Sequence, residues 1–410
     1  MKKVFLVAVI AIFVNAGDLG SILDYAMSHN ELSKSKEIDM KKPLLESQSI
    51  KKDYYPKIDV GGVYQRVDPR SDMRPGDIYN GYAKISFNLF DGNSKKYKIN
   101  AKKFEYQSLK FVNKFFKKKL QFDIVRYYFQ IKSLLANLDA LKKTKEYLTA
   151  EYKRVTNLYN VGTVTEDEVK KIEASLQNTI YLIDEKEYQI EESKKELSLY
   201  AGKDITNIGN SQIVPPSPAT KPDTLDSIKI LQAQQKTIQY SAKSLDAYYM
   251  PQVNLEDTYN LNGYGRTDTF HPKGEDHQNQ LMLTFNIRLF DNDSIKKQKE
   301  AILVQKLSLQ KQIDYNKKEQ NKDIKLALLN IKTIKSQIAS AKKSLEAANK
   351  AFELVSNRYH NGILTVVDYL DALSVKTNAM AQYKMALYNL QVAYATYYLY
   401  ANKKIKEFVR

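Results

Sequence analysis

The sequence predicts an α+β protein in which antiparallel strand pairs alternate with long helical hairpins. Two observations predict this class. The hydrophobic pattern changes from a period of two to a helical period at two places in the chain. The chain also repeats itself, without a gap, after 200 positions, as Gly162 and Gly362 show, and as the LFD runs at 89–91 and 289–291 show. A period of this length indicates one large structural unit used twice rather than a solenoid of short repeats.

The repeat divides the chain into five parts. We expect a signal peptide at 1–16, a first repeat at 17–202, a connector at 203–227, a second repeat at 228–402 and a tail at 403–410. Each repeat would contain a leading helix, a β-hairpin and a long helical hairpin. The connector contains four prolines, which exclude a long helix from it: Pro215, Pro216, Pro218 and Pro222.

The N-terminus has the pattern of a secretory signal peptide. Met1-Lys2-Lys3 precedes an apolar run at 4–14, and Ala16 follows as a small residue at the cleavage site. The run is too short to anchor the chain in a bilayer, and no later segment approaches 18 consecutive apolar residues, so we expect no transmembrane helix. The chain contains no cysteine, which excludes both disulfides and lipid attachment at an N-terminal cysteine.

Alternation of apolar and polar residues predicts two β-hairpins, one ahead of each helical hairpin. The alternating apolar residues are Ala83, Ile85, Phe87 and Leu89 in the first repeat and Leu281, Leu283, Phe285, Ile287 and Leu289 in the second. Their upstream partners are Ile58, Val60 and Tyr64, and Val253, Leu255, Tyr259 and Leu261. Asp257 interrupts the alternation of the third strand. Polar loops rich in turn residues separate the partners.

Strands of about ten residues with one apolar face fit a transmembrane β-barrel. An exported chain without a helical anchor can still enter a membrane as a closed barrel, because backbone groups must all be paired there. Four strands cannot close a barrel alone, since the smallest membrane barrels have about eight. Several chains would therefore share one barrel. The alternative interpretation is a pair of ordinary β-hairpins that pack on the helices.

The helical stretches run from about residue 100 to 200 and from about 300 to 400. They contain no proline, and their apolar residues step by three and four, as at Ile124, Tyr128 and Ile131. About 70 residues separate the first strand pair from the midpoint, which corresponds to a helix roughly 100 Å long. Gly162 and Gly362 interrupt the pattern at the midpoints, so we expect two long antiparallel helices joined by a tight turn in each repeat.

These motifs together resemble the TolC family of outer-membrane efflux and secretion channels. The similar features are the strand entries YYPKIDV and YYMPQVNL, the duplicated LFD, and the turn motifs YNVGTVTEDEV and YHNGILTVVDYLDA. The resemblance spans roughly residues 20–402. It implies a homotrimer whose 12-stranded transmembrane β-barrel, four strands per chain, continues into a long antiparallel α-helical coiled-coil barrel in the periplasm.

The resemblance also implies partners and a passive role. The chain would be the outer-membrane channel of a tripartite efflux or type I secretion system. A periplasmic adaptor would connect it to an inner-membrane pump of the RND or ABC type, and lipid of the outer membrane would surround the barrel. The exported cargo, whether drug, metal ion or protein, stays open. The alternative is a periplasmic or surface coiled-coil structural protein without a transport role.

The resemblance assigns the helical turns to docking of the adaptor. The tip residues are Asn160, Val161, Gly162 and Thr163 in the first repeat and Asn361, Gly362, Ile363 and Leu364 in the second. The glycines have an alternative role in turn geometry alone.

A second assignment places a periplasmic constriction at Asp368 and Asp371. At spacing i, i+3 the two carboxylates lie on one helix face, so three chains would bring six of them together. Convergent like charges attract cations. The alternative is that these aspartates cap the helix and complement its dipole.

A third assignment concerns contacts that hold the tip closed. Tyr359 matches a latching tyrosine of the family, Glu168 lies where an acidic partner is expected, and Leu364 replaces the expected arginine. Closure would therefore rest on fewer or different polar contacts.

Charge and motif content argue against other function classes. The net charge of +17 raises the question of nucleic-acid binding, but the signal peptide and the position of most lysines between apolar heptad residues favour solvated helix faces. No GxSxG, P-loop, HExxH or cysteine nucleophile is present, so we expect no enzyme activity and no cofactor. His271 and His277 share a loop with two acidic residues, but we expect a surface loop there rather than a metal site.

Overall fold

A computed structural model describes residues 17–69, 75–217, 221–266 and 276–410, so the expected signal peptide at 1–16 and the histidine at 271 lie outside the described residues. The chain forms two compact units. Among the described residues, one unit contains those up to Lys36 together with those within Asn113–Asp226 and Lys317–Arg410, and the other contains those within Glu37–Val112 and Ser227–Asn316. The first unit holds both helical turns, and the second holds the strands.

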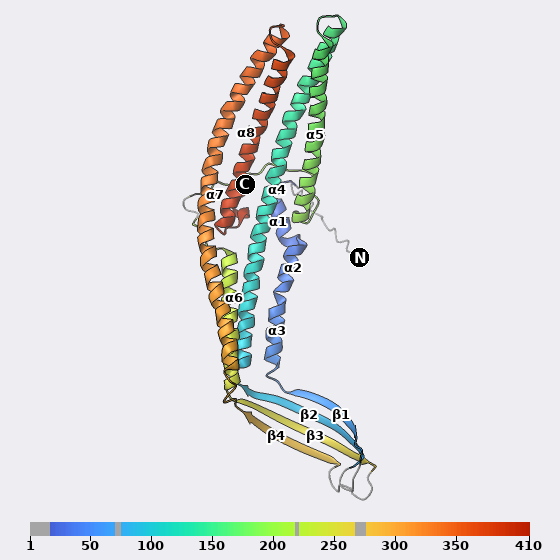
Figure 1. Cartoon of the computed structure of the whole chain (residues 1–410), viewed down its shortest axis with the longest axis vertical. Helices are drawn as coiled ribbons and strands as arrows, with labels where there is room; N and C mark the ends of the chain where they lie inside the picture. The colour runs from blue at the N-terminus through green and yellow to red at the C-terminus, as the bar shows by residue number, and fades with distance from the viewer. Residues whose placement is uncertain (1–16, 70–74, 218–220, 267–275) are drawn as a thin grey trace, which may run out of the picture. The chain divides into compact units, whose positions relative to one another are not determined.

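The predicted helical hairpins are confirmed in both repeats (Figure 1). Helix α4 (Ser94–Asn160) is followed by α5 (Glu166–Ala201), and α7 (Ser294–His360) is followed by α8 (Val366–Tyr400). Helices α4 and α7 both contain 67 residues, which gives each a length of about 100 Å at 1.5 Å per residue. The absence of proline and internal glycine allows the helices to continue for this length.

The leading segment forms three helices rather than the single helix expected from the sequence. These are α1 (Leu19–His29), α2 (Glu31–Asp39) and α3 (Lys41–Lys52). Asn30 separates the first two, because its side-chain oxygen accepts a hydrogen bond from the backbone N–H of Ser33 at 2.9 Å. An asparagine that binds the backbone in this way favours the start of a new helix over continuation of the old one.

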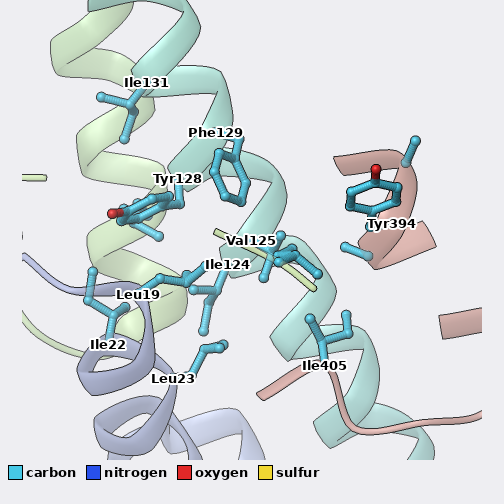
Figure 2. Packing of buried hydrophobic residues seen from close by; sticks show 14 of the residues in the cluster. Leu19, Ile22, Leu23, Ile124, Val125, Tyr128, Phe129, Ile131, Tyr394 and Ile405 are labelled. Carbon is cyan, nitrogen blue, oxygen red and sulfur yellow. The ribbon is translucent and has the colours of Figure 1, made fainter. Parts of the chain in front are cut away.

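The core of the helical unit forms where α1 packs on the middle of α4 (Figure 2). The apolar stripe that the sequence predicted along α4 supplies one side of it, including the fully buried Ile124 and Tyr128. The core residues labelled in Figure 2 come from four elements: Leu19, Ile22, Leu23, Ile124, Val125, Tyr128, Phe129, Ile131, Tyr394 and Ile405. The Tyr128 hydroxyl donates to the Gly209 carbonyl at 2.7 Å, so its polar atom is satisfied inside the core.

The connector and the C-terminal tail pair with each other. Ile213 forms an antiparallel bridge with Val409, and the backbone N–H of Gln212 donates to the Arg410 carbonyl at 2.8 Å. The tail also contains the short 3₁₀ helix η2 (Ile405–Phe408). The connector ends at α6 (Asp226–Asp246), and the 3₁₀ helix η1 (Ala247–Tyr249) follows.

The strands form one antiparallel sheet in the order β1-β2-β3-β4. They are β1 (Lys57–Arg66), β2 (Asp77–Asp91), β3 (Gln252–Gly265) and β4 (His277–Asn286). The expectation that the fourth strand includes Ile287 and Leu289 was wrong. Asn286 pairs with Gln252, the first residue of β3, so the following residues have no partner strand to bond with. Among the described residues, β1 and β4 are both open edges.

The register gives the sheet an apolar face and a polar face. Ile58 lies opposite Ile85, Phe87 opposite Leu255, and Leu255 opposite Leu283, so one face collects branched and aromatic side chains. The opposite face carries amides, and the Asn80 side chain donates to the Asn262 side chain at 2.8 Å.

The polar face contains further side-chain pairs, and the apolar face contains one acidic residue. On the polar face, Asn88 donates to Asn254 at 2.7 Å, and Lys84 pairs with Glu256 at 2.8 Å. On the apolar face, Asp257 lies between Ile85 and Leu281, as its interruption of the sequence pattern indicated.

Candidate functional site

The two helical turns have the same backbone structure. Gly162 and Gly362 have φ angles of 80° and 75°, in the left-handed region that favours glycine. The N–H of each glycine donates three residues back, to Tyr159 or Tyr359, at 2.9 Å. The N–H of the next residue donates five residues back, to Leu158 or Arg358, also at 2.9 Å. This is the Schellman motif, which satisfies the last carbonyls of a helix and reverses the chain.

The predicted tip residues therefore lie on two exposed turns. Val161 and Ile363 are 74% and 70% exposed, whereas Leu364 is half-buried and packs against an apolar cluster under the tips. An aliphatic contact thus occupies the position where the family resemblance suggested an arginine. The members of this tip cluster that are buried come from all four long helices: Leu148, Val155, Val169, Ile172, Leu176, Phe352, Tyr359, Val366, Tyr369 and Leu373.

The helices that leave the two turns begin differently. Thr365 caps α8 through a capping box, in which its hydroxyl accepts from the Asp368 N–H at 3.3 Å and its N–H donates to the Asp368 carboxylate at 2.9 Å. The equivalent Thr165 makes no side-chain capping bond to α5. Glu168, which stands at the position equivalent to Asp368, instead accepts a hydrogen bond from Tyr359 of the second repeat.

The structure brings the predicted gate residues together. The Tyr359 hydroxyl of α7 donates to the Glu168 carboxylate of α5 at 2.8 Å. Tyr359 is only 5% exposed. Burial and the hydrogen bond to Glu168 raise the pKa of Tyr359 above its ordinary value, because both disfavour the phenolate. The contact ties the first helical hairpin to the second close to the turns.

A buried carboxylate next to this contact was not found by the sequence reasoning. Glu151 of α4 has a side chain only 5% exposed, and it accepts from Arg154 at 2.6 Å and lies 3.2 Å from the His360 ring nitrogen. The Arg154 guanidinium also lies 5.1 Å from the centroid of the Tyr359 ring. Partial burial opposes the charge of Arg154, but the bonds to Glu151 raise the pKa of Arg154 overall.

Tyr369 completes this polar cluster from α8. Its ring centroid lies 5.0 Å from that of Tyr359 and 6.1 Å from that of His360, and its side chain is almost fully buried. Burial is the main cause that raises the pKa of Tyr369. The cluster of Glu151, Arg154, Tyr359, His360 and Tyr369 joins α4, α7 and α8, and no motif or spacing in the sequence marks Glu151 as its buried acid.

Asp368 and Asp371 both lie exposed near the start of α8. Hydrogen bonds from the hydroxyl and the N–H of Thr365 lower the pKa of Asp368, so the capping box stabilises the ionised carboxylate. The capping role that was the alternative interpretation is thus present at Asp368. Asp371 lies beyond the first turn of α8, where it cannot bind the free N–H groups of the helix start.

Neither a metal cluster nor a membrane-spanning helix is found in the described ranges of the chain. No three His, Cys, Asp or Glu side chains among these residues are grouped closely enough to hold a metal ion. No helix in the described ranges has a stretch long and apolar enough to cross a bilayer.

Comparison with known proteins finds one matching family model and several solved structures with the same fold. Residues 226–403, which include the second repeat, match the family model described as "Outer membrane efflux protein". No curated protein sequence is significantly similar to the chain.

Solved structures show the same fold over almost the whole chain. A membrane protein from Pseudomonas aeruginosa has a TM-score of 0.80 at 14% identity and covers 93% of both chains. The CmeC outer membrane channel of Campylobacter jejuni has a TM-score of 0.80 at 18% identity, with 94% of this chain and 85% of that chain covered.

A third structure extends the comparison. The outer membrane protein VceC of Vibrio cholerae has a TM-score of 0.76 at 12% identity, with 94% of this chain and 96% of that chain covered. The resemblance that the sequence motifs indicated is confirmed by these comparisons.

Proposed function

We propose that this chain is the outer-membrane channel of a tripartite efflux or type I secretion system. It acts as a passive conduit from the periplasm to the exterior, and an inner-membrane pump supplies the energy. The match of residues 226–403 to the family model described as "Outer membrane efflux protein" supports this proposal. The fold of the channels CmeC and VceC, shared at TM-scores of 0.80 and 0.76, supports this assignment. A transport protein of this kind performs no enzymatic step.

The observation that carries the proposal is the two-faced sheet with open edges. Its apolar face suits contact with lipid, and its amide-rich face suits a water-filled interior. The unpaired edges of β1 and β4 cannot remain open in a bilayer, because unsatisfied backbone groups are costly there. Pairing of β4 with β1 of another copy satisfies both edges, and three copies give a closed barrel of 12 strands.

The helical tips supply the periplasmic end of this conduit. The exposed turns around Gly162 and Gly362 present the surface for a periplasmic adaptor, which connects to a pump of the RND or ABC type. The contact of Tyr359 with Glu168 closes the tip, and Asp371 with Asp368 forms the constriction. The barrel lies in the outer membrane, and the helical part lies in the periplasm.

Membrane extraction and mass tests distinguish this function from a coiled-coil structural role. The mature protein should resist alkaline carbonate extraction and should require detergent for release. In mild detergent it should sediment as a trimer with mixed α and β circular dichroism. Release by carbonate, or a monomer with full β content, would overturn the channel proposal.

A further inference from the structure

Two rows of lysines with the same spacing lie on α4 and α6. Residues seven apart lie on nearly the same side of a helix, so each row is a line of charge about 21 Å long at 1.5 Å per residue. Five of the six side chains are exposed, and that of Lys229 is half-buried. The rows are Lys96, Lys103 and Lys110 on α4, and Lys229, Lys236 and Lys243 on α6.

Contacts between α4 and α6 align the two rows (Figure 1). The Lys236 ammonium lies 5.1 Å from the centroid of the Phe104 ring, and Phe104 follows Lys103 directly in the sequence. One heptad farther along α4, the Lys229 ammonium lies 5.9 Å from the centroid of the Phe111 ring. The order of these contacts shows that the two helices run antiparallel, so the six lysines form one basic strip along the helix pair.

The acidic residues of the same helical stretches pair with lysines outside the basic strip. Glu105 of α4 binds Lys102 at 2.9 Å, and Asp226 and Asp246, at the two ends of α6, bind lysines of α4 and α7 at 2.6 Å. No acid of α4 or α6 therefore neutralises the strip. Among the described residues, five of its lysines form no ion pair: Lys96, Lys103, Lys110, Lys236 and Lys243.

The other repeat does not contain the basic strip. The equivalents 200 positions away include only two lysines: they are Lys296, Leu303 and Gln310 for the α4 row, and His29, Lys36 and Pro43 for the α6 row. Helix α7 reaches the same length as α4 without such a row, so the long helix does not require these lysines. Charge that the fold does not require and that the chain does not neutralise indicates a surface for a negatively charged partner.

Aromatic rings lie between the two rows of lysines. The Phe104 ring of α4 stacks on the Tyr240 ring of α6 at a centroid distance of 5.3 Å, and the Lys243 ammonium lies 5.6 Å from the Tyr240 ring. Phe104, Phe111 and Tyr240 are all half-buried, so part of each ring remains accessible. The basic strip therefore combines an apolar middle with positively charged edges.

We propose that the basic strip binds an acidic amphipathic helix of a partner protein. Acidic residues at one heptad position of a helix recur about every 10.5 Å, which is also the spacing of the lysines in both rows. The apolar face of the partner helix packs on the accessible parts of the rings, and its acids pair with the lysines on either side. A lipid headgroup layer or a flexible anionic polymer matches the charge but has no apolar stripe for the rings.

This surface is separate from the helical tips. Both rows of lysines belong to the compact unit that contains the strands, whereas the tips belong to the other unit. The contact also depends only on α4 and α6, so it goes beyond the channel function and does not require it.

Binding of a defined peptide tests the proposal. The probe is a fluorescent synthetic peptide of about three heptads, with leucines at the a and d positions and glutamates at the e and g positions. The full-length protein is held in nanodiscs of phosphatidylcholine, and empty nanodiscs give the blank. Fluorescence anisotropy should show binding that weakens as salt is added. A peptide of the same composition in shuffled order has no amphipathic face, and equal binding of it would overturn the proposal.

Substitutions locate the peptide on the protein. Lys103→Gln with Lys236→Gln removes one charge from each row and should weaken binding about five-fold, as expected for the loss of two exposed ion pairs. Lys296→Gln with Lys311→Gln removes the same charge from exposed positions of α7 in the same compact unit, and it should bind like the wild type. Equal weakening in both variants would show a general effect of charge and would contradict the assignment to the basic strip.

Vesicles rich in phosphatidylglycerol distinguish a lipid surface from a helix. Peptide that stays bound in their presence supports the helix. If the peptide does not bind, and these vesicles bind in a way that Lys103→Gln with Lys236→Gln removes, the partner is a lipid surface and the proposal is wrong.

The outcomes separate this proposal from the channel function and from docking at the tips. A chain that sediments as a trimer but does not bind the peptide keeps the channel function and loses the assignment of the basic strip. Gly162→Val with Gly362→Val should bind the peptide normally, and loss of binding in this variant would place the site at the tips instead.

Discussion

The two hairpin tips have the same backbone hydrogen bonds, but their equivalent side chains make different contacts. Tyr159 and Tyr359 are equivalent in the repeat, yet the first is 43% exposed and the second is 5% exposed. Glu168 and Asp368 are also equivalent, yet Glu168 binds Tyr359 of the other hairpin while Asp368 caps its own helix. The turn geometry is thus common to both repeats, and the cross-repeat contacts make the pair asymmetric.

This difference separates two functions of the duplicated unit: reversal of the chain at each turn, and contact between the two hairpins. The backbone of each turn needs only glycine and a helix end, so both copies can keep it. The contact that joins the hairpins needs one donor and one acceptor, so each copy supplies one of them. Glu151 and Arg154 have Ala351 and Leu354 as their equivalents, so the buried ion pair also belongs to the first repeat alone.

The largest effect is expected from changes that break the feature common to both tips. Gly162→Val with Gly362→Val forces a β-branched residue into the left-handed region at both turns, which costs roughly 1–2 kcal/mol or more per site. Export should fail in an efflux assay, while trimer abundance in the outer membrane persists. The matched replacement by Asn, which tolerates this backbone region, should retain more export. Normal export by the valine variant would show that the tips do not dock the adaptor.

The aspartates of the second tip have no equivalent pair in the first, where Glu168 and Lys171 occupy the same positions. A trivalent cation added from the periplasmic side should block conductance in a planar bilayer, and Asp368→Asn with Asp371→Asn should abolish the block. Asp371→Asn alone leaves the capping box intact and should weaken the block without loss of stability. Equal block of the double variant and the wild type would make the constriction assignment wrong.

The buried ion pair of the first repeat should contribute more stability than any exposed pair nearby. Glu151→Ala leaves Arg154 and the His360 ring without their carboxylate, so we expect a loss of about 1–3 kcal/mol in the free energy of unfolding. Chemical denaturation followed by circular dichroism measures it. Glu146→Ala, at an exposed position of the same helix, is the control, with an expected change below about 0.5 kcal/mol.

The two equivalent tyrosines should respond differently to loss of the hydroxyl. Tyr359→Phe removes the hydrogen bond to Glu168 and should cost about 1 kcal/mol, whereas Tyr159→Phe should be nearly neutral. The pKa of Tyr359 is higher in the folded chain than in the unfolded chain, so its contribution is complete below about pH 10 and is lost as pH rises further. The stability difference between wild type and Tyr359→Phe should therefore shrink at alkaline pH. A constant difference up to pH 12 would contradict this interpretation.

The smallest effect concerns the helix starts. Thr365→Ala should lower the free energy of unfolding by about 1 kcal/mol, and Thr165→Ala should change it little, because only Thr365 makes a side-chain cap. The pKa of Asp368 is lowered in the folded state, so its contribution is present above the ordinary range of an aspartate and is lost as pH falls through that range. Chemical denaturation at neutral and at acid pH measures the effect of each variant and its dependence on pH. Equal losses of stability in the two alanine variants would contradict the conclusion that only Thr365 caps its helix.

Local pattern was sufficient to predict the long helices, their turns and the strands, but not the division of the leading segment into α1, α2 and α3. The spacing of Ile124, Tyr128 and Ile131 predicted a helix because residues three and four apart share a helix face in any context. Gly162 and Gly362 predicted the turns because a helix end of this type requires a positive φ. The strand alternation predicted both faces of the sheet, including the interruption at Asp257.

Tertiary structure decided where strands end and which polar groups meet. The end of β4 at Asn286 depends on where β3 begins, which the fourth strand's own sequence does not contain. Likewise, Glu151 follows the helical pattern as an ordinary charged residue, and only the approach of α7 and α8 makes it a buried acid bound to Arg154 and close to His360. Periodicity along one helix determines a face, whereas the identity of the group opposite that face depends on residues about 200 positions away. The local sequence therefore determined the four long helices, their turns and the faces of the sheet. Packing between the repeats determined which of the two equivalent tips carries each contact.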